Sequence, residues 1–314
     1  MTNLFILESA LGDALLSTGI IDKLKDEPSI LMVTSRSAGL FEDLPNLEKL
    51  IVLVKKPWKR QYLEAWKEIR GQSWNHIIDF RRTGFTYILK ANHKFRRNYI
   101  NKEKKELSQI HKVLHITQSL GSLEPLNPTI WISDDRLIRI QKLLQGRPTF
   151  AVAPTAGWTG KQWPLENFAA LLTNFCKTYP DAQVAIFAAP QERKFVEPLL
   201  ELIPKNQLFN TFGWSLLDIA TTIKSSRLFL GNDSGLMHMS AAVKIPTIAL
   251  FGPSDERDYG PWSDQTPSPH RVIRGEPFWG NLPQEATDTN CYMKSLLVPP
   301  VWEAVKEMWE SHGA

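Results

Sequence analysis

The chain has 314 residues, which is long enough for two α/β domains of about 150 residues each. Its composition, 43% hydrophobic and 22% charged, is that of a folded globular protein and excludes collagen-like and disordered chains. The net charge of +4 comes from the first half, where residues 1–146 hold 23 Lys and Arg against 16 Asp and Glu. This excess fits an anionic partner or a solvated basic surface, and it is too small to indicate nucleic-acid binding.

In chain order, the N-terminal half alternates apolar runs with helical or polar segments. After the first run, Leu16, Ile20 and Leu24 repeat every four residues, which is typical of a helix. The apolar runs, which we predict to be buried strands, cover residues 4–7, 30–33, 50–54 and 76–80. Strands that are apolar throughout and alternate with helices indicate a parallel sheet covered on both faces.

The alternation restarts after Gly146–Pro148, where we place a domain boundary. The second set of predicted strands covers residues 149–154, 183–189, 207–210, 227–231 and 247–252, with helices at about 165–179 and 191–203 and from about 216 and 234. The last helix, 300–311, has one apolar face, and we expect it to pack back toward the N-terminal domain. The predicted fold is α/β, with two doubly wound, Rossmann-like domains, 1–147 and 148–314, facing across a cleft.

The N-terminus does not look like a secretion signal, because it lacks a basic start and Glu8 and Asp13 interrupt its apolar run. No stretch approaches the roughly 20 apolar residues of a transmembrane helix, and two cysteines are too few for a disulfide framework. We therefore expect a cytoplasmic protein. His111 and His115 have the i, i+4 spacing of metal ligands, but without a third ligand nearby we predict packing or surface roles.

The most informative segment is GNDSGLMHMSAAVKIPTIALFGPSD, residues 231–255. A strand is predicted to end at Gly231 and a helix to begin near Ser234, so backbone N–H groups and the helix dipole favour an anion there. Gly235 permits close approach of a phosphate, and His238 lies one turn further along. The alternative is an ordinary helix cap, Asp233 or Ser234, with a helical histidine.

Two further segments follow predicted strands. APTAGWTGKQWP, residues 153–164, is rich in small polar residues and carries Lys161, so it is a candidate diphosphate cradle, although it lacks the GxxxxGK[ST] pattern of a Walker A loop. Gly12–Asp13 follows the first strand. Its carboxylate is a candidate general base, or a helix N-cap, or both.

Together these segments resemble the heptosyltransferase family of glycosyltransferases, family nine, which has the GT-B fold and includes the ADP-heptose:lipopolysaccharide enzymes. The resemblance extends over nearly the whole chain and is carried, in order, by residues 11–25, 74–84, 160–172, 189–193 and 231–255. The chain departs from the family at Leu7, Gly19 and Trp158, where the family tends to have Lys or Arg, Pro and a smaller residue.

The resemblance implies a role for each matching residue. Asp13 would be the catalytic base, and Lys161 would neutralise the donor diphosphate, with Thr155 or Thr159 beside it. Glu192 would bond the ribose and Trp214 would pack by the nucleoside. The residues implied to hold the sugar-phosphate end of the donor are Asp233, Ser234, Gly235 and His238.

The implied reaction is an inverting transfer of heptose from ADP-heptose to a lipopolysaccharide-core or related glycan. Lys161 and the helix start at Ser234 would stabilise the charge of the leaving diphosphate. Asp13 would take the proton as the acceptor attacks from the opposite face of the sugar. The chain contains no D-x-D triplet, so we expect no metal and no cofactor other than the nucleotide-sugar substrate.

Basic residues of the N-terminal half are candidates for an anionic acceptor, a glycan or glycolipid: Lys59, Arg60, Arg81 and Arg82. Trp58 among the cations of KKPWKR, residues 55–60, also favours peripheral contact with the cytoplasmic face of the inner membrane, with a solvated loop as the alternative. Two other functions stay open: a nucleotide-sugar epimerase of the same fold, and a catalytically inactive sugar-nucleotide-binding protein.

Overall fold

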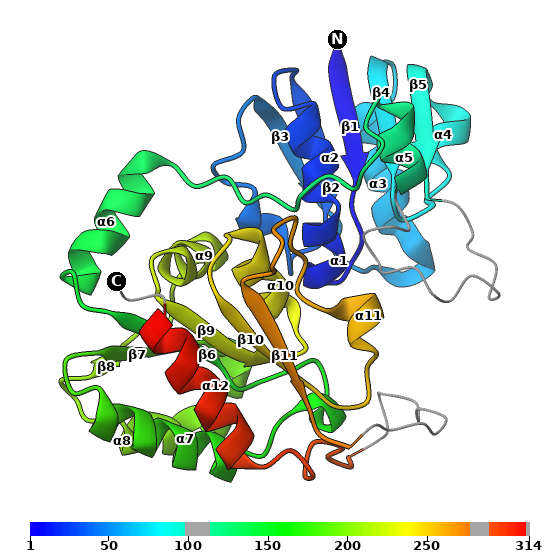
Figure 1. Cartoon of the computed structure of the whole chain (residues 1–314). Helices are drawn as coiled ribbons and strands as arrows, with labels where there is room; N and C mark the ends of the chain where they lie inside the picture. Colours follow the sequence, from blue (N-terminus) through cyan, green and yellow to red (C-terminus); the bar gives the residue numbers. More distant parts are fainter. Residues whose placement is uncertain (98–113, 277–288, 312–314) are drawn as a thin grey trace. The chain divides into compact units, whose positions relative to one another are not determined.

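The computed structural model describes residues 1–97, 114–276 and 289–311, and the chain forms two compact units, Met1–Ile132 and Ser133–Ala314 (Figure 1). The units divide before the boundary predicted at 147/148, because helix α6 (Asp134–Leu144) belongs to the second unit. Arg136 and Arg139 of α6 both form ion pairs with Asp218 of helix α9 (Leu216–Lys224). His111 and His115, whose roles we predicted from their spacing, lie outside the side chains that the structure describes.

The first unit contains a five-stranded parallel sheet with the strand order β3-β2-β1-β4-β5. Its strands are β1 (Thr2–Ile6), β2 (Ser29–Val33), β3 (Leu47–Val52), β4 (Ser73–Asp79) and β5 (Lys90–Arg96). The strand order reverses between β1 and β4. Loops that follow these two neighbouring strands therefore diverge and leave room for a ligand at the carboxyl edge of the sheet.

Helices cover both faces of this sheet (Figure 1). The helices are α1 (Leu11–Leu16), α2 (Thr18–Lys23), α3 (Arg60–Ile69), α4 (Phe85–Ile88) and α5 (Leu114–Ser119), with 3-10 turns at Ala38–Leu40 and Pro57–Lys59. On one face, Ala65 and Ile69 of α3 and Phe85 of α4 join the apolar strand residues in a single core. The predicted strand, helix, strand alternation is confirmed in this unit.

Two departures from the family pattern have a packing reason here. Leu7 is fully buried, so the core holds an apolar side chain where the family tends to have a cation. A Cβ on Gly19 would lie 2.6 Å from the carbonyl oxygens of both Leu126 and Asn127. Only glycine fits at this contact, because backbone atoms cannot move aside as a flexible side chain can.

The second unit contains a six-stranded parallel sheet with the order β11-β10-β9-β6-β7-β8. Its strands are β6 (Thr149–Ala153), β7 (Gln183–Ile186), β8 (Leu208–Phe209), β9 (Leu228–Asn232), β10 (Thr247–Phe251) and β11 (His270–Arg274). Here the order reverses between β6 and β9, which are neighbours although two strands separate them in sequence. The predicted second α/β sheet is confirmed.

The further helices of this unit are α7 (Leu165–Thr178), α8 (Arg193–Leu202), α10 (Gly235–Ala242), α11 (Glu256–Tyr259) and α12 (Val298–Ser311), with 3-10 turns at Thr159–Lys161 and Pro190–Glu192. The apolar stripe of α12 lies in the core of the second unit, where the Trp309 ring meets Phe175 of α7 edge to face at 4.9 Å. Its contact with the N-terminal domain stays a prediction.

Candidate active site

The loop after β6 is tied to the end of β9 by Asn232, a fully buried side chain. Its amide Nδ2 donates to the Pro154 carbonyl at 2.8 Å, and its Oδ1 accepts from the Trp163 backbone N–H at 3.0 Å. The two ends of the segment predicted to be a diphosphate cradle are therefore fixed at the carboxyl edge of the sheet, where its strand order reverses. Asn232 lies within the predicted segment 231–255, but the sequence did not indicate this role.

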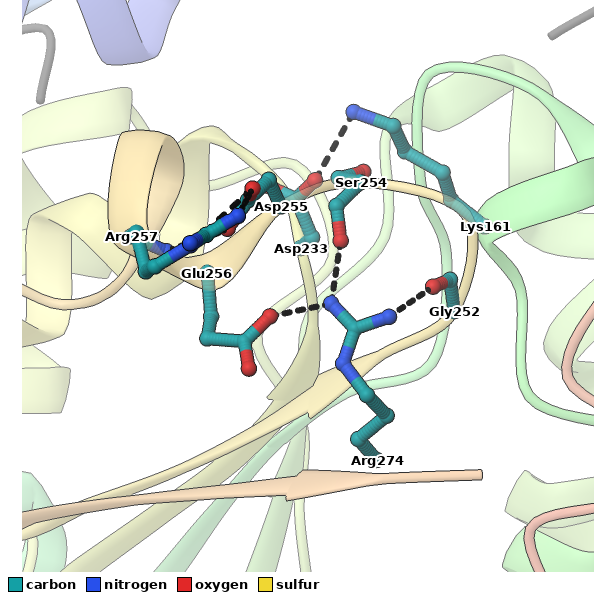
Figure 2. A network of polar contacts seen from close by, with 8 residues as sticks. All are labelled: Lys161, Asp233, Gly252, Ser254, Asp255, Glu256, Arg257 and Arg274. Atoms are coloured by element: carbon teal, nitrogen blue, oxygen red, sulfur yellow. Dashed lines mark hydrogen bonds and ion pairs between the residues drawn. The ribbon is translucent and has the colours of Figure 1, made fainter. Parts of the chain in front are cut away.

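Lys161 and Asp233 meet across this position. The Lys161 ammonium lies 2.8 Å from Oδ2 of Asp233, in side chains that are 20% and 5% exposed (Figure 2). The ring of Tyr259 in α11 contacts the same ammonium, with its centroid at 5.5 Å. Among the described residues, one carboxylate and one aromatic face hold this cation, so it can still bind a second anion, which is the property that a diphosphate site requires.

The helix after Asp233 is α10, and Ser234 is its N-cap residue. Its side chain makes no capping hydrogen bond, and its buried hydroxyl has no hydrogen-bond partner among the described residues. Ser234 is therefore the N-cap residue, one of the two predicted, but it does not cap the helix with a side-chain hydrogen bond. Gly235 is the first helical residue, and His238 is buried one turn further along. The unused hydroxyl and the helix start together suit an oxyanion.

A third loop, after β10, is shaped by Arg274 at the end of β11 (Figure 2). The guanidinium donates to the Gly252 carbonyl at 2.7 Å and also bonds the Ser254 carbonyl and the Glu256 carboxylate. Arg274 fixes the start of the loop that leads into α11 and Tyr259. The sequence analysis did not select Arg274, because the strand that carries it was not predicted.

The residues implied in nucleoside binding lie on the other side of β6. Glu192 accepts hydrogen bonds at Oε2 from the Thr155 hydroxyl at 2.9 Å and from the Ala189 backbone N–H at 2.8 Å. The structure therefore brings Thr155 and Glu192 together and fixes the orientation of the carboxylate. Trp214 is half-buried with its ring edge to face against Phe209, at a centroid distance of 5.4 Å. Thr159 is exposed, at the start of the 3-10 turn that ends at Lys161.

Trp158 covers the backbone immediately before Lys161. Its ring packs so closely on Gly160 that a Cβ there would overlap it, and it meets the ring of Tyr292 at 5.9 Å in an edge-to-face arrangement. The Tyr292 backbone N–H donates to the Gly160 carbonyl at 3.3 Å, and the Cys291 thiol contacts the Gln162 carbonyl at 3.3 Å. Trp158, the third departure from the family pattern, thus packs with Tyr292 against the turn that carries Lys161.

In the first unit, Asp79 organises the loop after β4. The fully buried carboxylate accepts from the Arg81 backbone N–H at 3.1 Å and from both the backbone and the hydroxyl of Thr83, at 2.7 and 2.8 Å. Burial raises the pKa of Asp79, and the hydrogen bonds from Thr83 act in the opposite direction. Asp79 is a positioning residue that the sequence analysis did not select.

Asp13 lies in the first turn of α1, where Ala10 is the N-cap residue, so the prediction of an N-cap role for Asp13 is wrong. The negative charge of Asp13 acts on the pKa of Glu8. The Glu8 carboxylate lies 2.5 Å from the Arg97 guanidinium. The pKa of Glu8 is raised above its ordinary value, mainly by burial and in part by the charge of Asp13. The charges of Arg97 and Arg81 act in the opposite direction. Glu8, Asp13, Arg81 and Arg97 therefore form one charged group at the carboxyl edge of the sheet.

The predicted acceptor residues are divided in the structure. Arg81 belongs to this charged group and lies over the Tyr62 ring, at 5.8 Å, near the start of α3. Arg60 is the first residue of α3 and is exposed. Lys59 and Arg82 are exposed as well, and both have a left-handed backbone, with φ of 54° and 58°.

Within residues 1–97, 114–276 and 289–311, no group of three His, Cys, Asp or Glu side chains is placed to hold a metal ion. None of the helices in those ranges has the length and apolar character needed to cross a bilayer.

Comparison with known proteins identifies the family. The family model for glycosyltransferase family 9 (heptosyltransferase) matches residues 53–269. Lipooligosaccharide heptosyltransferase 2 of Campylobacter jejuni subsp. jejuni serotype O:6 is 26% identical over 275 residues, covering 82% of this chain and 84% of the relative.

Solved structures show the same fold. The Escherichia coli ADP-heptose LPS heptosyltransferase II has a TM-score of 0.77 at 19% identity and is covered over its full length, as is this chain. The E. coli heptosyltransferase WaaC with ADP has a TM-score of 0.72 at 16% identity, over 98% of this chain and 100% of that one. The predicted two-sheet GT-B fold and the predicted enzyme class are thus confirmed, and the chain belongs to glycosyltransferase family 9, the heptosyltransferases.

Proposed function

We propose that this enzyme transfers heptose from ADP-heptose to an acceptor of the lipopolysaccharide or lipooligosaccharide core, with inversion and without a metal ion. Family membership favours this reaction over the epimerase and over a protein that only binds sugar nucleotides. The names of the relatives, heptosyltransferases of the lipopolysaccharide and lipooligosaccharide type, support this donor and acceptor class. If the acceptor is of this kind, the enzyme would meet it at the cytoplasmic face of the inner membrane.

The observation that carries the proposal is the Lys161–Asp233 pair at the place where the strand order reverses. When a donor binds, the diphosphate would become the second anion beside the Lys161 ammonium. The N–H groups at the start of α10 and the unused Ser234 hydroxyl would bond the remaining phosphate oxygens. These groups are fixed before the reaction, so they can stabilise the departing diphosphate without reorganising. The fixed ammonium would stabilise the negative charge of the leaving diphosphate, which is the role of a metal ion in other transferases.

The remaining donor contacts follow from positions already fixed by hydrogen bonds. Glu192 has its Oε2 occupied by Thr155 and Ala189, which leaves Oε1 to accept from the ribose hydroxyls. Trp214 offers the half-buried face of its indole to the nucleoside. Asp233 and His238 would orient the sugar beside the phosphates.

On the acceptor side, Asp13 would remove the proton from the attacking hydroxyl. The hydroxyl oxygen forms a bond to the anomeric carbon as the bond to the diphosphate breaks, and Asp13 keeps the proton. The candidates for binding an anionic acceptor are Lys59, Arg60, Arg81 and Arg82. Among them, Arg81 belongs to the charged group that contains Asp13, and its charge lowers the pKa of Glu8 in that group.

Calorimetric titration of ADP, UDP and GDP in EDTA tests the donor site. We expect ADP to bind most tightly to the wild type and to lose at least about tenfold in affinity with Lys161→Ala, since charge-assisted hydrogen bonds contribute roughly 1.5–3 kcal/mol. Lys177→Ala, at an exposed lysine of α7, is the matched control and should bind as the wild type does. If no nucleotide binds to the folded protein, the donor-site assignment fails. A preference for UDP would refute the ADP-linked donor alone.

A further inference from the structure

One face of the first unit carries large apolar side chains that face solvent. Helices α3 and α4 share the core on this face of the sheet, and the rings of Tyr62 and Phe85 meet at 6.4 Å. Their outer sides, with the turn that precedes α3, hold four exposed apolar residues: Trp58 at 95%, Leu63 at 54%, Tyr87 at 69% and Ile88 at 63% exposure. Three such residues on two neighbouring helices, with Trp58 in the adjoining turn, are more than the scattered single residues of an ordinary surface.

The backbone at the first of these residues is unusual as well. Trp58 and Lys59 both have left-handed φ values, 55° and 54°. A bulky residue rarely adopts this conformation, which costs free energy. Because the Trp58 side chain is almost fully exposed, packing within the protein does not account for the strain.

The charge on this face is basic. Lys94 pairs with Ile77, a residue of the core under α3 and α4, and Arg96 lies on the same face of β5 as Lys94. That face is the side of α4, because the Arg96 guanidinium lies over the Tyr87 ring at 4.9 Å. The two acidic residues of α3 are already paired, Glu64 with Lys56 at 2.6 Å and Glu68 with Lys49 at 2.8 Å. Further exposed cations lie on α3 and in the segment that leads into it, and Lys67 is one helical turn from Leu63: Lys55, Lys59, Arg60, Lys67 and Arg70.

We propose that this α3–α4 surface, with Trp58, Leu63, Tyr87 and Ile88 at its centre, docks on an anionic phospholipid bilayer. Tryptophan and tyrosine prefer the interface between lipid and water, and clustered lysines are attracted to anionic headgroups. The proposal rests on the proposed function in one respect: a lipid-linked acceptor is presented at such an interface. Docking would concentrate the enzyme where its acceptor lies.

Sedimentation with vesicles tests the surface without any substrate. The wild type should sediment with vesicles of phosphatidylcholine plus phosphatidylglycerol, weakly with phosphatidylcholine alone, and less at high salt. The Lys67→Gln, Lys94→Gln variant should bind anionic vesicles roughly 25-fold more weakly, at about 1 kcal/mol for each cation. The Trp58→Ser, Tyr87→Ser, Ile88→Ser variant should lose most binding to the same vesicles.

Leu123→Ser, at a leucine of the same unit that is 83% exposed outside this surface, is the matched control and should bind as the wild type does. Equal vesicle binding by the wild type and the triple variant, with both proteins showing the same ADP titration, would overturn the docking proposal. The ADP titration also separates the two proposals, because the donor residues lie in the second unit and the altered residues lie in the first.

Discussion

Replacement of Gly160 by alanine should displace the Trp158 indole from the turn that carries Lys161. A Cβ at position 160 would lie 2.0 Å from Cζ3, 2.3 Å from Cη2 and 2.6 Å from Cε3 of the Trp158 ring. These distances are far inside van der Waals contact, so the ring must move. The backbone of Gly160 does not have the left-handed φ that would by itself require glycine, so the effect is purely one of space.

The cost has two parts. Forcing a methyl group into a packed site typically costs about 1–3 kcal/mol. Moving the indole also removes its edge-to-face contact with Tyr292, an interaction of about 0.5–1.5 kcal/mol. We expect Gly160→Ala to lower the free energy of unfolding of the second unit by roughly 1.5–4.5 kcal/mol, with a fall of about 2–4 °C in Tm for each kcal/mol. ADP affinity should fall too, because Lys161 is the next residue.

A double-mutant cycle with Trp158→Ala isolates the cause. With the indole removed, the alanine methyl at 160 has room, so Gly160→Ala should become nearly neutral in thermal and urea unfolding. Gly157→Ala is the control within the same loop, since a Cβ there would meet no atom within 4 Å. Independent sites give additive effects. An equal cost of Gly160→Ala with and without Trp158 would therefore refute the steric explanation.

Three further predictions concern catalysis, the loop after β10 and pH. Asp13→Asn should lower kcat by about 10²–10⁴-fold and leave ADP affinity unchanged, as measured by initial rates and calorimetry; a variant with wild-type turnover would exclude Asp13 as the base. Arg274→Met leaves the Gly252 and Ser254 carbonyls without their donor, so urea unfolding should show a loss of about 1–3 kcal/mol, together with weaker ADP binding. Burial lowers the pKa of His270 to about 4 from the ordinary 6.5, so the stability that its neutral form contributes is complete above pH 6.5 and is lost as pH falls toward 4. His270→Gln should reduce this acid sensitivity in unfolding curves at pH 7 and 5, and an unchanged pH dependence would contradict the role of His270.

The sequence predicted the central strands and the edge strands β3 and β8, but it did not predict the other two edge strands, β5 and β11. Their residues, KANHKFR and HRVIR, mix charges with apolar residues, because an edge strand is only partly covered and charge there discourages pairing with other chains. The omission had consequences for the site. Arg97 directly follows β5 and Arg274 ends β11, so the cations that bond Glu8 and the loop after β10 could not be placed from the sequence.

The candidate site was predicted as separate segments rather than as an arrangement. Residues 153–164 and 231–255 were selected for their composition and for their resemblance to the family. Their meeting at Lys161 and Asp233 depends on β6 lying beside β9, with β7 and β8 displaced to the other side. Periodicity shows that a strand exists, but not which strand becomes its neighbour. The contact of the Trp158 ring with Gly160 and Tyr292 is likewise a tertiary one, so the sequence showed Trp158 only as a departure from the family.

The two units place different side chains at the same position of the sheet, where each side chain holds a loop by hydrogen bonds. In each, the fourth strand ends in a fully buried polar residue beside the first strand, Asp79 in one and Asn232 in the other. An ionised aspartate only accepts hydrogen bonds, and Asp79 gathers the N–H groups of its own loop. An asparagine donates and accepts, so Asn232 can join the Pro154 carbonyl to the Trp163 N–H and hold both ends of a neighbouring loop. A neutral residue also suits this place, because a second carboxylate beside Asp233 would weaken the binding of any anion at the Lys161 ammonium.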